Sequence, residues 1–261
     1  MPPGLSRIRA NTRRSPNLKI HKPPQLRAQV SAQAVAAVSM RANAEPPSCI
    51  EPVVLTKAQS GVTGSISVLP SDSRFTGVGM KGRAIFLDRD GVLNDVILRD
   101  GRPYSPASVE EVIIPDGVHK VCEKLRSHGF LLVVVTNQPD VARGVQDRQV
   151  VDDIHAFLRS RLPLDDIRVC YHDDDDECDC RKPKPGLLLA AARVWDIDLA
   201  RSFMVGDRWR DIEAGRAAGC RTIFINRNYQ ERRPEGMEFE TDSLAKAVEW
   251  ILSLEDVNRD L

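Results

Sequence analysis

The 261-residue chain lacks any apolar run of the roughly 20 residues that a membrane-spanning helix needs, so we expect no membrane partner. It also lacks net charge, because 37 lysines and arginines balance 37 aspartates and glutamates. This balance is uneven along the chain. Residues 1–79 contain ten basic and three acidic residues, a difference of 10 − 3 = +7, so the remainder carries −7. An acidic remainder disfavours a nucleic-acid-binding surface.

The first 79 residues differ from the rest of the chain. They contain no acid before Glu45, are rich in Arg, Ser, Ala, Gln and Pro, and show no sustained hydrophobic period. Such a composition is typical of an organelle transit peptide, which would place the protein in a plastid or mitochondrion. We favour the alternative, an over-extended start in a cytoplasmic protein, because MKGRAIF at residues 80–86 resembles a natural N-terminus. Either way, we expect residues 1–79 to be disordered and residues 80–261 to form one domain with a sizeable core.

Two acids follow an apolar segment that reads as a buried strand, in the sequence FLDRDGVLN at residues 86–94. Asp88 and Asp90 lie two residues apart, so on extended backbone they point the same way, and Arg89 should point to the opposite side, where a surface ion pair is its simplest interpretation. Acids at the carboxyl edge of a parallel strand lie where α/β folds bind ligands. One carboxylate can bind a cation or act as a nucleophile, and the other can transfer a proton.

Three later segments complete the pattern. LLVVVTNQ at 131–138 is a second apolar strand that ends in a hydroxyl and two amides, and FMVGDR at 203–208 is a third that ends in an acid. CRKPKPG at 180–186 supplies fixed positive charge before a helix. A dianionic phosphate approaches a carboxylate only where a cation and donors screen the repulsion. The four segments together therefore indicate one phosphoryl-transfer site.

Strands and helices alternate through the body. We expect strands at 83–88, 130–135, 167–171, 203–206 and 222–225, with helices beginning near residues 118, 150, 186, 209 and 244. This alternation predicts an α/β, Rossmann-like, doubly wound parallel sheet of about five strands. No insertion is long enough for a cap domain, so the loops 94–115 and 170–185 are expected to wall an open site.

A group of three thiols and one imidazole predicts a structural zinc site. All four lie within eleven residues, and a set of four such ligands suits tetrahedral zinc. They are Cys170, His172, Cys178 and Cys180. A disulfide is the alternative, which the lack of a secretory signal disfavours. The zinc would pin the loop that carries Arg181 and Lys182.

Other polar residues of the body are given no catalytic role. The acidic run 173–177 is expected to be a solvated loop tip that faces away from the site, because its charge would repel phosphate. We expect His119, His128 and His155 on helix surfaces or helix ends.

The order of these motifs, over roughly residues 81–254, resembles that of the haloacid-dehalogenase-like phosphatase superfamily. The resemblance implies that Asp88 attacks phosphorus and forms an aspartyl-phosphate, while Asp90 protonates the leaving oxygen and then activates water. It implies that Thr136 donates a hydrogen bond to the phosphoryl group and that Lys182 neutralises its charge.

The resemblance also implies a magnesium site. Mg²⁺ would be held by Asp88, by the main-chain carbonyl of Asp90 and by Asp207. Asp211 either orients the magnesium waters or is simply an acid in the first turn of a helix. Four neighbouring residues are expected to bind the substrate: Asn137, Gln138, Arg181 and Arg208.

The zinc loop narrows the resemblance to the group that contains heptose-1,7-bisphosphate phosphatases and histidinol-phosphate phosphatases. TNQ at 136–138 followed by ARG at 142–144 resembles the heptose branch, whereas the five residues between His172 and Cys178 resemble the histidinol branch. Pro139 and Asp140 depart from the small Ser-Gly pair that is usual in heptose enzymes. We rank a heptose bisphosphate first, histidinol phosphate second and another sugar or nucleotide-sugar precursor third.

Two functions of other classes remain open. One is a zinc-stabilised binding module without turnover, which is disfavoured because every catalytic position holds a competent residue. The other is a nucleic-acid 3′-phosphatase, which the acidic body disfavours. We therefore expect a monomeric, magnesium-dependent phosphomonoester hydrolase whose partner is a small phosphorylated metabolite.

Overall fold

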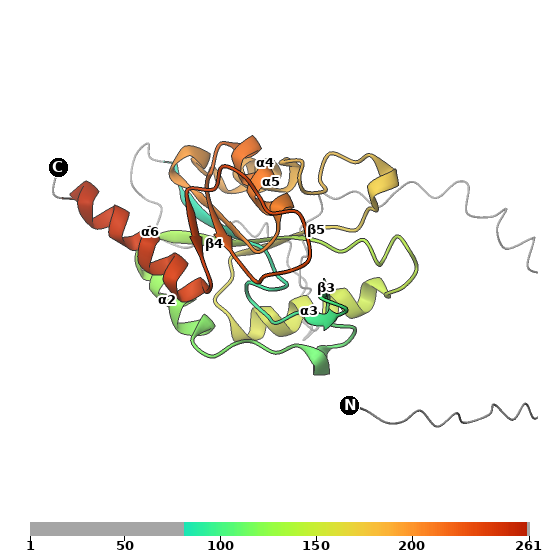
Figure 1. The fold of residues 1–261 in the computed structure, drawn as a ribbon. Coiled ribbons are helices and arrows are strands. Elements are labelled where there is room, and N and C mark those ends of the chain that lie inside the picture. Colours follow the sequence, from blue (N-terminus) through green and yellow to red (C-terminus); the bar gives the residue numbers. More distant parts are fainter. Residues whose placement is uncertain (1–80, 260–261) are drawn as a thin grey trace, which may run out of the picture. The chain divides into compact units, whose positions relative to one another are not determined.

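The central sheet of the computed structural model, which describes residues 81–259, contains six parallel strands (Figure 1). They are β1 (Arg83–Leu87), β4 (Phe130–Asn137), β5 (Asp166–Cys170), β6 (Phe203–Gly206), β7 (Arg221–Ile225) and β8 (Phe239–Thr241). Their order across the sheet is β5-β4-β1-β6-β7-β8. The predicted fold class is confirmed, with β8 as an additional strand. The predicted extension, residues 1–79, lies outside the described residues.

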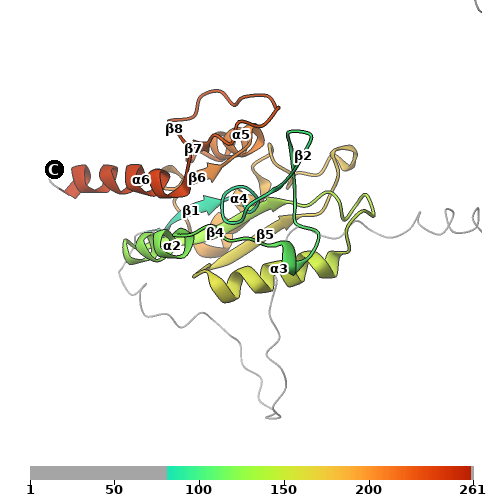
Figure 2. The ribbon, with the colours of Figure 1, turned by 60° about the horizontal axis from the view of Figure 1, so that its bottom comes forward.

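Helices cover both faces of this sheet. One face carries α2 (Val118–Ser127), α3 (Arg148–Arg161) and α6 (Leu244–Arg259), and the other carries α4 (Gly186–Trp195) and α5 (Trp209–Ala218). Figure 1 shows α4 and α5 above the sheet, and Figure 2 shows α2 and α3 in front of it. Along β1, Ile85 and Leu87 belong to the first core, whereas Ala84 and Phe86 belong to the second. Burial on both sides explains why these strands are continuous apolar runs.

The strand order places a ligand site at the carboxyl ends of β1 and β6. From β1 the chain continues to its neighbour β4 and then to β5, and it returns on the other side of β1 to build β6, β7 and β8. The connections therefore diverge between β1 and β6, which leaves a crevice there. Asp88 directly follows β1 and its amide donates to Val205 O at 3.0 Å, so it lies at this crevice.

The loop after β1 contains a short antiparallel hairpin that the sequence analysis did not predict. Its strands are β2 (Ile97–Arg99) and β3 (Arg102–Tyr104). Three 3₁₀ turns complete the described elements: η2 (Val109–Glu111), η3 (Asp174–Asp176) and η4 (Leu199–Arg201). Within residues 81–259, no helix has the length and apolar character to cross a bilayer.

Candidate active site

A pocket opens at the crevice between β1 and β6. Its lining joins the β2–β3 hairpin, the strand ends, the zinc-loop region and the first turn of α5. The lining residues are Asp88, Asp90, Val96, Pro103, Tyr104, Ser105, Thr136, Asn137, Lys182, Asp207, Arg208, Arg210 and Asp211. Both loops that were expected to wall the site, 94–115 and 170–185, contribute to it. The predicted acids, hydroxyl and lysine therefore share one pocket.

Lys182 is the cation at the centre of the pocket. Its ammonium lies 2.8 Å from Asp88 Oδ1 and 2.5 Å from Asp211 Oδ1, and it donates to Val135 O at 2.7 Å. Burial lowers the pKa of Lys182, but the charges of Asp211 and Asp88 outweigh burial and raise it above its usual value. The buried ammonium is therefore charged and paired with both carboxylates.

Asn137 positions this lysine. Its Oδ1 accepts from the Lys182 amide at 3.1 Å, and its Nδ2 donates to the Lys182 carbonyl at 3.0 Å. This pair of bonds ties the end of β4 to the Lys-Pro turn. Asn137 was expected to bind substrate. Asn137 lines the pocket and its side chain is bonded to the main chain of Lys182, so it positions the lysine, and contact with substrate stays a prediction.

Three buried acids form a group that fits a divalent cation. One ligand atom from each of Asp88, Asp207 and Asp211 lies within 4.8 Å of the other two. With Lys182, the cluster has a formal charge of −3 + 1 = −2. Asp207 Oδ1 is buried without a hydrogen-bond partner. A cation with two positive charges and a preference for oxygen ligands would both balance the cluster and satisfy this atom.

The pKa values of two of these acids are raised by burial and by the neighbouring carboxylates. Burial raises the pKa of Asp88 to about 6, although the Lys182 charge opposes it. Burial, followed by the Asp88 charge, raises the pKa of Asp207 well above its usual value. Of the two roles left open for Asp211, the position of an acid in a first helical turn is observed, whereas orientation of magnesium waters stays a prediction. Asp211 Oδ1 pairs with Lys182, and its Oδ2 accepts from Arg208 N at 3.0 Å as an acid in the first turn of α5.

The loop between β7 and β8 holds Asp207 in place from outside the pocket. Tyr229 donates its hydroxyl to Asp207 Oδ2 at 2.8 Å, and Arg227 donates twice to the carbonyl of Gly91, at 2.8 and 3.0 Å. Gly91 adopts a φ of 85°, and a Cβ there would lie 1.8 Å from Asp207 Oδ2. The turn after Asp90 therefore requires glycine, both for its left-handed backbone and for the close approach of Asp207.

Asp90 is held as a carboxylate by four residues. Arg89 Nη2 donates to its Oδ2 at 2.9 Å, Asn94 Nδ2 to its Oδ1 at 2.9 Å, Ser105 to its Oδ2 at 2.9 Å and Gln138 Nε2 to its Oδ2 at 3.0 Å. Burial raises the pKa of Asp90, but the Arg89 charge and the hydrogen bonds outweigh burial and lower it below its usual value.

The prediction that Arg89 is a surface residue was wrong. Its side chain is 0 % exposed, because β1 ends at Leu87 and the alternation of an extended strand no longer applies at residue 89. Arg89 Nη1 lies 3.0 Å from His155 Nε2 on α3, which is also fully buried. Burial, and then the Arg89 charge, lower the pKa of His155 well below its usual value, so the neutral ring accepts from Arg89. His155 was expected on a helix surface or helix end. It is instead buried and contacts Arg89, which donates to Asp90.

The Gln138 side chain, like that of Asn137, is hydrogen-bonded to other residues of the site. Besides Asp90, its Nε2 donates to Thr136 Oγ1 at 2.9 Å, and its side chain is buried. Gln138 therefore positions these two residues, and the expectation that it binds substrate stays a prediction. Thr136, also buried, lines the pocket as predicted from the end of β4.

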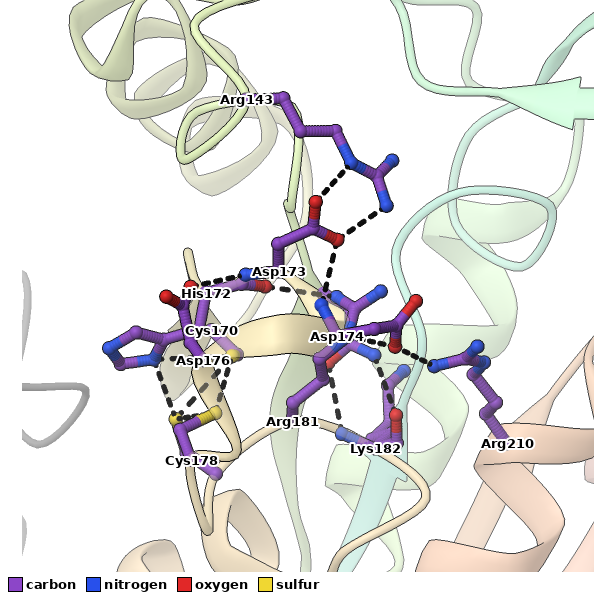
Figure 3. Close-up of polar contacts among 12 residues, drawn as sticks. Arg143, Cys170, His172, Asp173, Asp174, Asp176, Cys178, Arg181, Lys182 and Arg210 are labelled. Carbon is purple, nitrogen blue, oxygen red and sulfur yellow. Dashed lines mark hydrogen bonds and ion pairs between the residues drawn. The ribbon is translucent and has the colours of Figure 1, made fainter.

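The side chains of the four predicted zinc ligands lie close together in the structure. One ligand atom from each of the four lies within 4.8 Å of the others. Cys170 Sγ lies 3.7 Å from both Cys178 Sγ and His172 Nδ1, and Cys180 Sγ lies 3.4 Å from both Cys170 Sγ and His172 Nδ1 (Figure 3). Zinc–sulfur bonds of about 2.3 Å in a tetrahedron place two sulfurs about 3.8 Å apart. The cluster therefore fits tetrahedral zinc.

The acidic run between the zinc ligands is largely exposed and none of its residues lines the pocket, as predicted, but its first two acids pair with arginines. Asp173 forms a bidentate pair with Arg143, at 2.7 and 2.5 Å. Asp174 Oδ1 accepts from Arg181 Nε at 2.8 Å and from Arg210 Nη1 at 2.7 Å, and Arg210 lines the pocket. The last acids of the run, Asp175, Asp176 and Glu177, are exposed as expected.

Arg181 and Arg208, which were expected to reach the distal part of a substrate, both have protein partners. Arg181 binds Asp174, and Arg208 pairs with Glu231 of the β7–β8 loop through Nε at 2.9 Å and through Nη2. Arg208 and Arg210 both line the pocket, but only Arg208 was predicted to lie at the site. Three of the residues missed carried a signal: Asn94 lies in the first motif, Ser105 lies in a loop already assigned to the site, and Arg210 lies next to a motif.

Comparisons with known proteins agree with this geometry. A family model described as HAD-hydrolase-like matches residues 179–249. D-glycero-β-D-manno-heptose-1,7-bisphosphate 7-phosphatase of Pseudomonas aeruginosa is 36 % identical over 151 residues, which cover 56 % of this chain and 82 % of that protein. The protein of the same name from Escherichia coli K12 is 36 % identical over 182 residues, covering 65 % and 88 %.

Comparison with solved structures also finds similarity to a heptose-bisphosphate phosphatase. The chain resembles the D,D-heptose 1,7-bisphosphate phosphatase from B. bronchiseptica, solved with magnesium and phosphate, with a TM-score of 0.57 and 34 % identity. That match covers 66 % of this chain and 98 % of the other. A HAD-like phosphatase from Mesorhizobium loti, 24 % identical with a TM-score of 0.54, shares the fold and covers 66 % of this chain and 85 % of its own.

Proposed function

This chain belongs to the haloacid-dehalogenase-like phosphatases, together with the heptose-bisphosphate phosphatases that it resembles, and we propose that it removes a phosphate from a heptose 1,7-bisphosphate. The observation that carries the proposal is the Asp88 carboxylate, buried in a pocket beside Lys182 and two further acids that fit a divalent cation. Relatives that carry the heptose-bisphosphate name support the substrate.

In the first half-reaction, an Asp88 carboxylate oxygen attacks phosphorus and forms an aspartyl-phosphate, while the bond from phosphorus to the sugar oxygen breaks. The carboxyl group of Asp90 donates its proton to that leaving oxygen. Lys182 and the Thr136 hydroxyl stabilise the phosphoryl oxygens as charge develops on them. Mg²⁺, held by Asp88, Asp207 and the main-chain carbonyl of Asp90, would screen the repulsion between the carboxylate and the dianionic phosphate.

In the second half-reaction, the Asp90 carboxylate takes a proton from water, whose oxygen attacks phosphorus, and the bond to Asp88 breaks. The Asp90 side chain is held in this basic form by Arg89, Asn94 and Gln138. The first half-reaction needs the protonated form, so Asp90 must turn from these donors toward the leaving oxygen before it acts as an acid.

The test is phosphate release by the protein with Mg²⁺ across a substrate panel. The panel contains both anomers of heptose 1,7-bisphosphate, histidinol phosphate, other sugar phosphates and a 3′-phosphorylated oligonucleotide. We expect selective turnover of a heptose bisphosphate. Preference for histidinol phosphate would overturn the substrate assignment, and a folded protein that turns over nothing would favour the binding module.

We further propose that a structural Zn²⁺ is bound by Cys170, His172, Cys178 and Cys180. Its role follows from its place in the chain. The loop between β5 and α4 contains only the short turn η3, and Cys180 directly precedes Arg181 and Lys182. Metal ligands would fix this loop and, through it, the lysine of the active site.

Cys178→Ser should remove the zinc. We expect about one zinc per wild-type chain by elemental analysis, and a variant that loses most of it and melts about 5–15 °C lower. Cys122→Ser, which changes a buried cysteine on α2 outside the cluster, should keep the zinc and serves as the control. A Cys178→Ser protein with full zinc content would contradict the assignment.

A further inference from the structure

Two fully buried polar side chains beside Asp90 take no direct part in the proposed reaction. Arg89 and His155 are both 0 % exposed, and neither lines the catalytic pocket. Arg89 follows β1, whereas His155 lies on α3, 66 residues later. Burying a charged group and an imidazole costs free energy unless both find polar partners, so their contacts identify what the pair does.

The guanidinium of Arg89 has partners on two sides. Its Nε donates to both carboxylate oxygens of Asp90, at 3.1 and 3.2 Å, and its Nη2 donates to Asp90 Oδ2 at 2.9 Å. On the other side, Nη1 lies 3.0 Å from His155 Nε2. Since a guanidinium only donates, the imidazole nitrogen accepts this bond. Because the guanidinium is planar and rigid, an acceptor that fixes Nη1 also fixes the direction of Nε and Nη2 toward Asp90.

Stability alone does not explain the histidine. The other buried residues of α3 are Val151, Ile154 and Leu158, so His155 lies on an apolar face. With Nε2 as acceptor, the neutral ring carries its proton on Nδ1, and within residues 81–259 this buried atom has no hydrogen-bond partner. Replacing both partners of a buried polar pair by apolar groups is often neutral or stabilising. The pair is therefore explained by what Arg89 does at Asp90.

Arg89 differs from the other three residues that donate to Asp90. Asn94, Ser105 and Gln138 each donate one neutral hydrogen bond to one of its oxygens. Arg89 contacts both oxygens and supplies the charge. Charge-assisted hydrogen bonds are stronger than neutral ones. The orientation of the Asp90 carboxylate therefore depends most on where Arg89 is held.

We propose that His155 is a positioning residue for the second half-reaction: by accepting a hydrogen bond from Arg89, it holds Asp90 in the orientation in which the carboxylate takes a proton from water. This inference rests on the proposed function, because it concerns hydrolysis of the aspartyl-phosphate. In that step the water oxygen bonds to phosphorus, its proton passes to Asp90, and the bond from phosphorus to the Asp88 oxygen breaks. The first half-reaction needs Asp90 turned away from Arg89, so loss of His155 should slow that step less.

The experiment compares two amide substitutions. His155→Gln keeps an acceptor near the place of Nε2, whereas the shorter side chain of His155→Asn does not reach Arg89. The substrate is ³²P-labelled p-nitrophenyl phosphate with Mg²⁺, because its leaving group departs without a proton and breakdown of the intermediate then limits turnover. We expect His155→Asn to lower steady-state turnover about tenfold, well within the roughly 10²- to 10⁴-fold that a positioned general base contributes. The fraction of acid-quenched protein that carries label should rise, and His155→Gln should bring both quantities back toward wild type.

Two further variants support the comparison. Arg89→Lys keeps the charge but loses the planar fork, so it should also raise the labelled fraction. His119→Asn, the same substitution at an exposed histidine of α2, should change neither turnover nor labelling.

A purely structural role of His155 gives a different result. A partly unfolded variant would lose turnover and label together, and the initial burst of p-nitrophenol, which counts active sites, would fall with them. Label is therefore expressed per burst site. The inference is overturned if neither His155→Asn nor Arg89→Lys raises this ratio, or if His155→Gln behaves like His155→Asn. Absence of label from wild type and variants alike would overturn the covalent mechanism itself, and this inference with it.

Discussion

Asp88→Asn is expected to lower kcat/KM for phosphate release by at least about 10³-fold, because an amide cannot form the aspartyl-phosphate. The fold should survive the change. Lys182 keeps its contact with Asp211 at 2.5 Å, and the amide removes one of three crowded negative charges. Loss of activity would therefore report on chemistry rather than on unfolding.

The measurement is phosphate release with Mg²⁺, together with acid-quenched labelling by a ³²P substrate. Wild-type protein should retain label on Asp88, and the variant should retain none. Asp153→Asn, the same substitution at an exposed position of α3, is the matched control and should keep full activity. Substantial turnover by Asp88→Asn would rule out covalent catalysis by this residue.

Lys182→Met should combine loss of activity with a large loss of stability. The substitution leaves Asp88 and Asp211 buried without their shared cation, and removing one partner of a buried ion pair costs about 3–5 kcal/mol. Turnover should fall about 10²-fold or more, because the phosphoryl charge loses a preorganised cation.

Urea unfolding with and without added Mg²⁺ tests the cause. A cation bound by the three acids replaces part of the lost positive charge, so Mg²⁺ should stabilise the variant more than the wild-type protein. Lys184→Met is the control, because Lys184 pairs at the surface with the fully exposed Asp179 and should cost less than about 1 kcal/mol. Equal stability losses at 182 and 184 would show that the buried pairing contributes nothing.

The sequence predicted the elements with long apolar patterns and clear ends. The helices predicted to begin near residues 186 and 209 begin at Gly186 and Trp209, and the second ends before Gly219, which adopts the left-handed conformation at the C-cap. Strands β1, β4 and β6 were recognised because burial on both faces makes them continuous apolar runs. By contrast, β8 and the β2–β3 hairpin consist of three-residue strands, too short for any pattern to identify.

The identities of the site residues could be predicted from sequence, but the residues that contact and hold them could not. Each motif ends a parallel strand or precedes a helix, and the strand order brings those ends together. The contact of Arg89 with His155 joins positions 66 residues apart, and that of Tyr229 with Asp207 joins positions 22 apart across a loop. Neither spacing follows a helix or strand period.

The sequence by itself therefore determined the fold class and predicted the phosphoryl-transfer residues and the metal-ligand sets, because those depend on residue type and on local order along strands. Only the tertiary structure decided what each polar side chain binds. Asn137 contacts Lys182, Gln138 contacts Asp90, and Asp174 contacts Arg210. The physical reason is that buried polar groups must find partners, and packing of distant segments decides which partners are near.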